Sequence, residues 1–182
     1  AVNELGKYEG ENSGSVSAFA VESGDGRLKH LNTQSSKGAA PCHIVLDKAG
    51  KYALIANYTD GCVGVLPIAS GGKLSPMSSF VQHRGSSVTP RQKSPHGHSI
   101  NLDAANRFAV AADLGLDQLL VYRFDAGSGK LAPNDPPYTK VAPGAGPRHF
   151  HFHPNGRWLY SIQEEASTAV RFDYDAATGR LA

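Results

Sequence analysis

A short unit occurs three times in the sequence, and this repetition limits the possible folds more than any other feature. In each copy a turn residue is followed by a basic residue, an aromatic residue and a run rich in Ala, Val, Ile and Leu. A polar turn that leads into such a run is typical of one β-strand following another. The copies span residues 40–58, 96–114 and 146–165, and their turn residues are Gly50, Asn106 and Gly156.

A second marker, Gly-Lys/Arg-Leu, sets the length of the repeat. Each interval between markers holds four short apolar runs joined by Gly, Asp and Asn turns, and no segment has a long helical periodicity. Repeats of about 40 to 50 residues with four strands each are typical of β-propeller blades. The sequence therefore predicts an all-β fold, a β-propeller of four-stranded antiparallel blades. The four marker glycines, Gly26, Gly72, Gly129 and Gly179, are 46, 57 and 50 residues apart by subtraction.

The first strand of each unit has one apolar face. Side chains alternate with a period of two along a strand, so Phe150 and Phe152 fall on the same face as the aliphatic residues of the other two units. We expect both phenylalanines to be buried between neighbouring sheets. The opposite face of the third unit carries His149, His151 and His153.

The row of alternating histidines raises the question of a metal site, because imidazoles on one side of a strand match a spacing that some metal sites use. A structural interpretation is stronger for His153. This residue occupies the position of Asp47 and Asp103 in the other units, where a side chain at a strand end bonds the backbone of the turn. No Cys or acidic cluster lies nearby in the sequence, so we predict no metal site.

The composition argues against several classes of partner. The 182 residues carry a formal net charge of only +2, without a basic stripe or an acidic tail, so neither nucleic acid nor an anionic membrane is indicated. No apolar run approaches the roughly 20 residues of a membrane span, and the first residues lack the layout of a signal peptide. The two cysteines, Cys42 and Cys62, show no CxxC spacing, so we expect buried free thiols and a reducing, cytoplasmic location.

Two longer segments resemble a known family. They are SPHGHSINLDAANRFAVAADLGLDQLLVYRFDAGSGKL, which begins at Ser94, and GPRHFHFHPNGRWLYSIQEEASTAVRFDYDAATGRL, which begins at Gly146. Together they are similar to the seven-bladed lactonase family, which includes propeller-type 6-phosphogluconolactonase and the fungal carboxy-muconate lactonising enzyme. The resemblance covers nearly the whole chain. It is specific because Pro-His before one inner strand, Gly-Pro-Arg-His before the next and the Asp-Leu-Gly-Leu-Asp turn occur together in family order.

The resemblance implies a ring of seven blades, whereas this chain accounts for about three to four of them. We expect one partial propeller domain, with a partial blade at 1–39, blades at 40–94 and 95–145, and a partial blade at 146–182 that lacks its fourth strand. Open blade ends would leave strand edges unpaired, which natural proteins avoid. We therefore infer a fragment, or a chain that needs a second chain to complete the ring.

Ligands of propellers bind at the central channel, where the inner strands begin. Cys42, His98 and Arg148 hold equivalent positions there. The resemblance implies that His98, with His96 as the alternative, acts in catalysis with Arg148 and Glu164. The residues expected to contact the substrate are His96, His149 and Arg148.

The resemblance implies hydrolysis of a sugar lactone, most of all 6-phosphogluconolactone, by acid and base chemistry that uses no metal and no other cofactor. The expected partner is a small anionic lactone, because arginine offers a planar fork for a phosphate or a carboxylate. A muconate cycloisomerase and a noncatalytic binding scaffold are the alternatives. Without the resemblance, Arg148 and Glu164 would be read as a structural ion pair, and the histidines as core residues. We expect the chain alone to have little or no activity.

Overall fold

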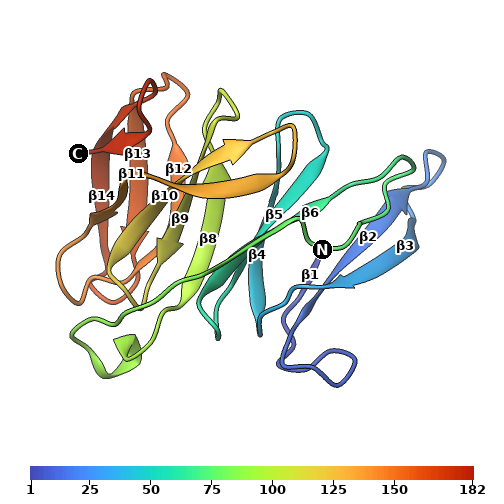
Figure 1. Cartoon of the computed structure of the whole chain (residues 1–182), viewed down its shortest axis with the longest axis horizontal. Helices are drawn as coiled ribbons and strands as arrows, with labels where there is room; N and C mark the ends of the chain where they lie inside the picture. Colours follow the sequence, from blue (N-terminus) through green and yellow to red (C-terminus); the bar gives the residue numbers. More distant parts are fainter.

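The computed structural model describes residues 1–182, and every strand pairing in it is antiparallel. The strands form four sheets that stand side by side, from the N-terminal sheet in blue to the C-terminal sheet in red (Figure 1). Strands that follow one another in the chain are neighbours in each sheet, which confirms the predicted propeller blades. The first sheet has three strands, β1 (Val2–Asn3), β2 (Ser15–Val21) and β3 (Leu28–Ser35); the second has β4 (Pro41–Leu46), β5 (Tyr52–Asn57), β6 (Cys62–Pro67) and β7 (Ser79–Gln82); the third has β8 (Gly97–Leu102), β9 (Phe108–Asp113), β10 (Gln118–Asp125) and β11 (Lys130–Lys140); the fourth has β12 (Pro147–Phe152), β13 (Trp158–Gln163), β14 (Thr168–Asp175) and β15 (Arg180–Leu181).

The fourth sheet differs from the expectation of three strands. The short strand β15 pairs with β14 and completes a four-stranded order. Gly179 has a φ of +75°, a left-handed conformation that glycine adopts without strain, and it turns the chain back onto β14. The Lys/Arg and Leu of the Gly-Lys/Arg-Leu marker are therefore the first residues of the fourth strand, in β15 and also in β11. The sequence had suggested that the fourth strand follows the marker.

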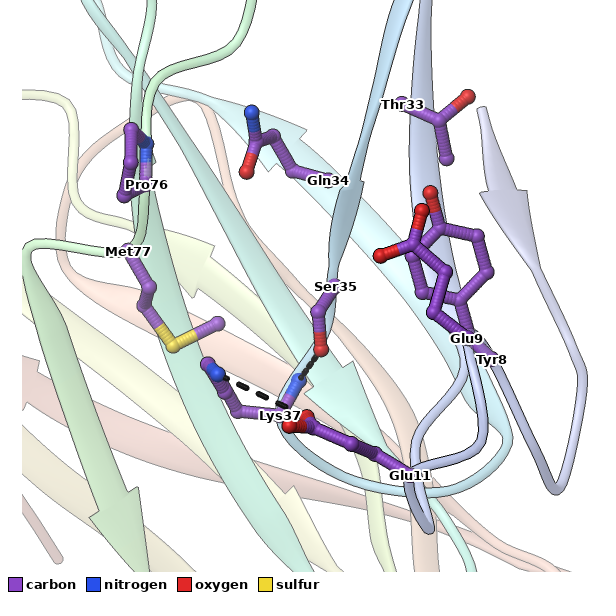
Figure 2. A pocket seen from close by; sticks show the side chains of 9 residues that line it. All are labelled: Tyr8, Glu9, Glu11, Thr33, Gln34, Ser35, Lys37, Pro76 and Met77. Carbon is purple, nitrogen blue, oxygen red and sulfur yellow. Dashed lines mark hydrogen bonds and ion pairs between the residues drawn. The ribbon is translucent and has the colours of Figure 1, made fainter.

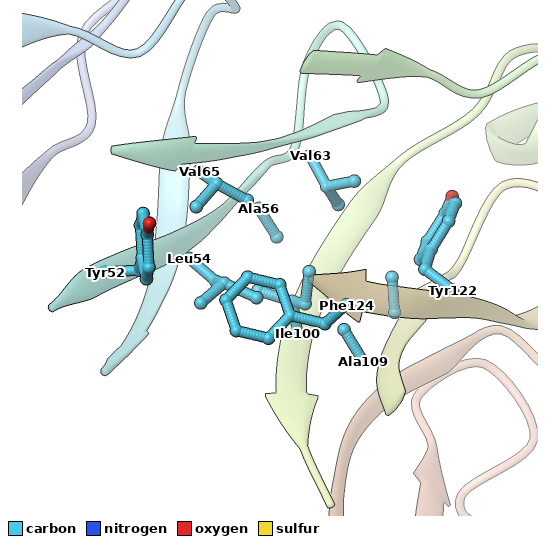
Figure 3. Close-up of a cluster of buried hydrophobic side chains, with 10 residues drawn as sticks. Tyr52, Leu54, Ala56, Val63, Val65, Ile100, Ala109, Tyr122 and Phe124 are labelled. Atoms are coloured by element: carbon cyan, nitrogen blue, oxygen red, sulfur yellow. The ribbon is translucent and has the colours of Figure 1, made fainter. Parts of the chain in front are cut away.

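Three apolar cores lie between successive sheets and hold the blades together. In the middle core, Tyr52 and Leu54 of β5 pack with Ile100 of β8 and Phe124 of β10, and Ala109 of β9 fills the remaining space (Figure 3). A second core joins the third and fourth sheets, and a smaller one joins the first and second. Burial on both faces of β5 and β9 strongly specifies the register of these two strands.

The predicted strand phase is confirmed for Phe150, whose ring is buried in the core between the third and fourth sheets. Phe152 packs against the same core but is only half-buried, so the expectation of full burial was wrong for this residue. Its ring lies at the margin of the core, with its centroid 4.9 Å from the ring of Tyr174.

Polar side chains stabilise the turns between the first and second strands of the sheets. Asp47 accepts hydrogen bonds from the backbone N–H groups of Lys51 and Tyr52, at 2.6 and 2.8 Å. His153 acts in the same way, because its Nδ1 accepts a hydrogen bond from the N–H of Asn155 at 3.1 Å. The structural interpretation of His153 is thus confirmed.

The longest connection in the molecule joins β7 to β8 and contains a single turn of 3-10 helix, Pro90–Gln92. No helix of the structure is long and apolar enough to cross a membrane. This connection matters for the pocket described next, because it brings a side chain from outside the repeated units to the start of the inner strands.

Candidate functional site

A β-bulge lies at the start of each inner strand, where β4, β8 and β12 begin. The register of each strand with its neighbour shifts at this point, and the residues left out of regular pairing include Cys42, His98 and Arg148. A bulge bends the strand and turns a side chain away from its regular direction. All three side chains line one pocket. The repeat predicted that these residues hold equivalent positions, and the shared bulge is the feature of the backbone that makes them equivalent.

In the second, third and fourth sheets, the second strand runs antiparallel to the inner strand and therefore ends beside its start; β1 holds the equivalent place in the first sheet. Tyr58 follows β5 directly, Glu164 follows β13, and Glu4 follows the short strand β1. These three side chains also line the pocket. The corresponding residue of the third sheet, Leu114, is buried and packs away from it.

The pocket has a volume of about 330 Å³, enough for a small molecule. Its walls are mostly polar or charged. Among the predicted site residues, His98, Arg148, His149 and Glu164 line it, whereas His96 does not. The other lining residues are Glu4, Cys42, Tyr58 and Arg91.

Glu164 joins two arginines that come from different parts of the chain. Its Oε2 lies 2.6 Å from Nε of Arg148, and its Oε1 accepts a hydrogen bond from Nη1 of Arg91 at 2.5 Å. Burial opposes ionisation of Glu164, but the hydrogen bond from Arg91 and the charges of both arginines outweigh it and lower the pKa of the carboxyl group. Glu164 is therefore held as a carboxylate, which suits a residue that orients the arginines.

The arginines keep donors free for a ligand. Arg91 donates through Nε to the hydroxyl of Tyr58 at 2.9 Å and through Nη1 to Glu164, which leaves Nη2 unused. The guanidinium group of Arg148 forms an ion pair with Glu164, and its two Nη groups have no partner within the protein. These N–H groups offer the planar geometry that binds phosphate or carboxylate oxygens.

His98 is a neutral imidazole at the wall of the pocket. Its ring centroid lies 5.1 Å from that of His149 and 5.6 Å from that of Tyr58, and its Nδ1 is buried without a hydrogen-bond partner. Burial, followed by the positive charge of Arg148, lowers the pKa of His98 to about 4. At neutral pH this side chain can therefore accept a proton.

His96 lies behind the pocket rather than in its wall. Its ring stacks on Tyr58 with a centroid distance of 4.6 Å, and its two ring nitrogens each lie 3.0 Å from a backbone carbonyl oxygen, those of Tyr58 and Arg91. These contacts attach the loop that carries Arg91 to the end of β5. The two histidines of Pro-His-Gly-His thus have different positions, with His98 facing the pocket and His96 supporting its wall.

Sequence reasoning missed Arg91, Tyr58 and Glu4 as lining residues. The alignment of strand ends contained a signal for two of them, because Glu4 and Tyr58 occupy the position of Glu164 in their own units. Arg91 had no such signal, since the loop from β7 to β8 has no counterpart in the other units.

Both cysteines are free, but only Cys62 is buried as predicted. Cys42 is half-buried and lines the pocket, so the expectation of a plain buried thiol was wrong for it. Burial and the nearby charge of Glu4 raise the pKa of the Cys42 thiol to about 12. The thiol therefore stays protonated and contributes no charge to the pocket.

The three alternating histidines separate in space. His149 lines the pocket, His151 is exposed, and the ring of His153 lies 5.2 Å from that of Trp158. No group of three or more His, Cys, Asp or Glu side chains is arranged to hold a metal ion.

A second pocket, of about 400 Å³, lies beside the first sheet and has no part in this arrangement. Figure 2 shows its lining, which includes the Lys37 and Glu11 side chains in an ion pair at 3.8 Å. Its walls come from β3, the loop at 8–11 and the segment before β7. It holds no arginine or histidine, so it offers neither a planar anion clamp nor an imidazole.

Comparisons with known proteins identify the family of the chain. Residues 1–182 match the family model described as Lactonase, 7-bladed beta-propeller. The chain is 33% identical over 175 residues to the 6-phosphogluconolactonase of Bacillus subtilis (strain 168), covering 94% of this chain and 48% of that protein.

Solved structures give the same result for the fold. A periplasmic gluconolactonase from Pseudomonas aeruginosa superposes with a TM-score of 0.91 at 32% identity, covering 99% of this chain and 51% of that one. A crystal structure from Lactobacillus plantarum superposes with a TM-score of 0.87 at 29% identity, covering 97% and 49%. The chain thus spans about half the length of the relatives that it matches.

Proposed function

The chain belongs to the seven-bladed β-propeller lactonase family, and we propose that it supplies the Arg–His–Glu part of a site that hydrolyses 6-phosphogluconolactone. The observation that carries the proposal is that His98, Arg148 and Glu164 line one small pocket. The name of the Bacillus subtilis relative supports the choice of substrate.

The unused guanidinium N–H groups of the pocket favour an anionic ligand. Arg91 and Arg148 share one carboxylate, that of Glu164, and the carboxylate of Glu4 in the same pocket balances the second positive charge in the formal count. Both arginines keep unused N–H groups, and a phosphate oxygen can accept two of them at once. In the proposal, Arg91 and one Nη group of Arg148 bind the phosphate of the substrate.

Opening of the lactone requires a bond from water oxygen to the ring carbonyl carbon and departure of the ring oxygen with a proton. In the proposal, neutral His98 accepts the proton from the attacking water and then returns it to the ring oxygen. The remaining N–H groups of Arg148 stabilise the negative charge that develops on the carbonyl oxygen. His149 completes the wall and contacts the bound sugar acid.

In this proposal Glu164 keeps both guanidinium groups in place as an ionised carboxylate. All the proposed steps use side chains of the chain itself, and no metal ion takes part in them.

The proposal is tested by hydrolysis of freshly prepared 6-phosphogluconolactone, measured above spontaneous opening, with a seven-bladed protein that contains this chain. We expect turnover that EDTA does not reduce and that His98→Gln lowers by about a hundredfold or more. Arg107→Gln serves as a control and should leave turnover unchanged. Arg107 lies in the turn before β9, far from the pocket. A wild-type protein that binds the lactone without opening it would indicate the scaffold alternative, and conversion of a carboxy-muconate instead would indicate the cycloisomerase.

A further inference from the structure

Asp117 is a buried carboxylate outside the pocket that holds together two of the segments that build it. It ends the turn Asp113-Leu114-Gly115-Leu116-Asp117 between β9 and β10, and only 3% of its surface is exposed. A buried carboxylate is stable only when its oxygens are hydrogen-bonded. Asp117 meets this condition with four donors, two on each oxygen, which are Gln92 Nε2 and Gly146 N on Oδ1, and Ser87 Oγ and Gly144 N on Oδ2.

Two of these four contacts, from Gln92 and Ser87, hold the loop that carries Arg91. Gln92, the next residue, is fully buried and donates to Asp117 Oδ1 at 2.7 Å and to the carbonyl oxygen of Leu114 at 2.8 Å. Ser87, which precedes Arg91 in the same loop, donates to Asp117 Oδ2 at 2.5 Å. Ser87 and Gln92, which lie on either side of Arg91 in the sequence, are therefore both bonded to a carboxylate that Arg91 does not contact.

The other two contacts, from Gly144 and Gly146, hold the segment that leads to Arg148. The N–H groups of Gly144 and Gly146 donate to Asp117 at 2.7 and 2.8 Å. The carbonyl oxygen of Gly146 in turn accepts the N–H of Glu164 at 2.7 Å. One side chain thus sets the backbone on both sides of the Arg148–Glu164 ion pair.

We propose that Asp117 is a positioning residue that holds Arg91, Arg148 and Glu164 in register with one another. The two arginines come from segments more than fifty residues apart in sequence, and the carboxylate of Asp117 is bonded to both segments. Small displacements of groups around a substrate are costly for binding and rate. The kinetic part of this inference rests on the proposed function; its structural part does not.

Asp117→Asn is the informative variant because it keeps the shape of the side chain. Whichever way the amide is turned, its NH₂ group faces the N–H of Gly144 or of Gly146, so one backbone donor loses its acceptor. Asp47→Asn is a matched control. Asp47 is equally buried and also accepts four hydrogen bonds, but it lies in the turn at the opposite end of β4.

The first measurement is hydrogen exchange of the backbone amides, followed by mass spectrometry of peptides covering 85–92 and 143–148. We expect Asp117→Asn to speed exchange in both peptides by about tenfold or more, and Asp47→Asn to leave both unchanged. Gln92→Met, which removes only the first connection, should speed exchange in the peptide 85–92 alone, and it serves as the test if Asp117→Asn does not fold. Unchanged exchange in both peptides of Asp117→Asn, or of the peptide 85–92 in Gln92→Met, would overturn the inference.

The second measurement is the affinity for 6-phosphogluconate and the KM for the lactone in the seven-bladed protein. Asp117→Asn should weaken both by about tenfold, while Asp47→Asn should leave both at the wild-type value. Equal effects of the two variants would show that Asp117 acts only through stability. A wild-type protein without lactonase activity would refute the proposed function, whereas the exchange result would still decide the role of Asp117.

Discussion

Oε2 of Glu164 lies 2.6 Å from Nε of Arg148 in an ion pair that joins the end of β13 to the start of β12. Sixteen residues separate the two in sequence, and the β12–β13 hairpin brings them together. The sequence alone allowed this pair to be read as structural. Its position in the wall of a pocket, with Arg91 on the other carboxylate oxygen, favours a role in arranging a site for an anion.

The lowered pKa of Glu164 predicts a specific acid sensitivity. A carboxyl group with a lowered pKa in the folded state adds stability that is complete above its ordinary pKa of 4.5 and is lost as the pH falls through the lower folded value. Glu164→Gln should therefore make the unfolding free energy less dependent on pH below about 4.5. Urea unfolding from pH 6 to pH 3 measures this dependence. The control is Glu22→Gln, at an exposed glutamate without an ion pair, and a wild-type slope in Glu164→Gln would contradict the prediction.

The fork of Arg148 predicts that charge alone cannot replace it. Arg148→Lys keeps the positive charge but loses the two unused Nη groups, so affinity for 6-phosphogluconate should fall by about tenfold or more. Isothermal titration of the seven-bladed protein measures this affinity. Arg171→Lys, at an exposed arginine of β14, should bind as the wild type does. Wild-type affinity in Arg148→Lys would mean that Arg148 is structural.

The environment of His98 predicts protonation well below the usual range for histidine. The pKa of His98 is about 4 in the folded protein and about 6.5 in the unfolded chain. The unfolded chain therefore binds the proton first, and the unfolding free energy decreases as the pH falls from about 6.5 to about 4. The acid limb of kcat/KM should likewise lie near pH 4. An NMR titration of the His98 ring, assigned with His98→Gln, measures the pKa directly. Half-protonation near pH 6.5 would contradict the proposed environment.

The core position of Phe150 predicts a large loss of stability on truncation. Phe150→Ala removes a ring that is buried between the third and fourth sheets, which should cost about 3 to 5 kcal/mol of unfolding free energy. Urea unfolding provides the value. Tyr160→Ala, on the exposed face of β13, is the comparison and should cost about 1 kcal/mol or less. Similar losses in the two variants would show that the strand phase is wrong.

The fold was predictable because its signals are local and repeated. Turn residues such as Gly50 and Gly156 recur at matching positions, and period-two alternation in the first strands assigns Phe150 to the core. The error at Phe152 has a physical basis, since alternation gives the face of a strand but not the distance from the edge of the core. The early start of β15 was missed because a two-residue strand has no pattern of its own.

The candidate site was predictable only where it coincides with the repeat. Cys42, His98 and Arg148 align because each blade begins with the same bulge. Arg91 lies in a loop that occurs once, and only tertiary structure brings it to Glu164, 73 residues away in sequence. The choice between His96 and His98 depends on the bulge, which the sequence does not reveal.

The claim that these residues form an active site within a closed ring is tested most directly by comparing two proteins in one assay. Hydrolysis of fresh 6-phosphogluconolactone, above its spontaneous opening, is measured for the 182-residue chain and for a seven-bladed protein that contains it. We expect turnover by the seven-bladed protein and little or none by the chain alone, because the enclosing blades restrict water and complete the binding of the anion. Equal turnover by the two proteins, or none by either, would contradict the account.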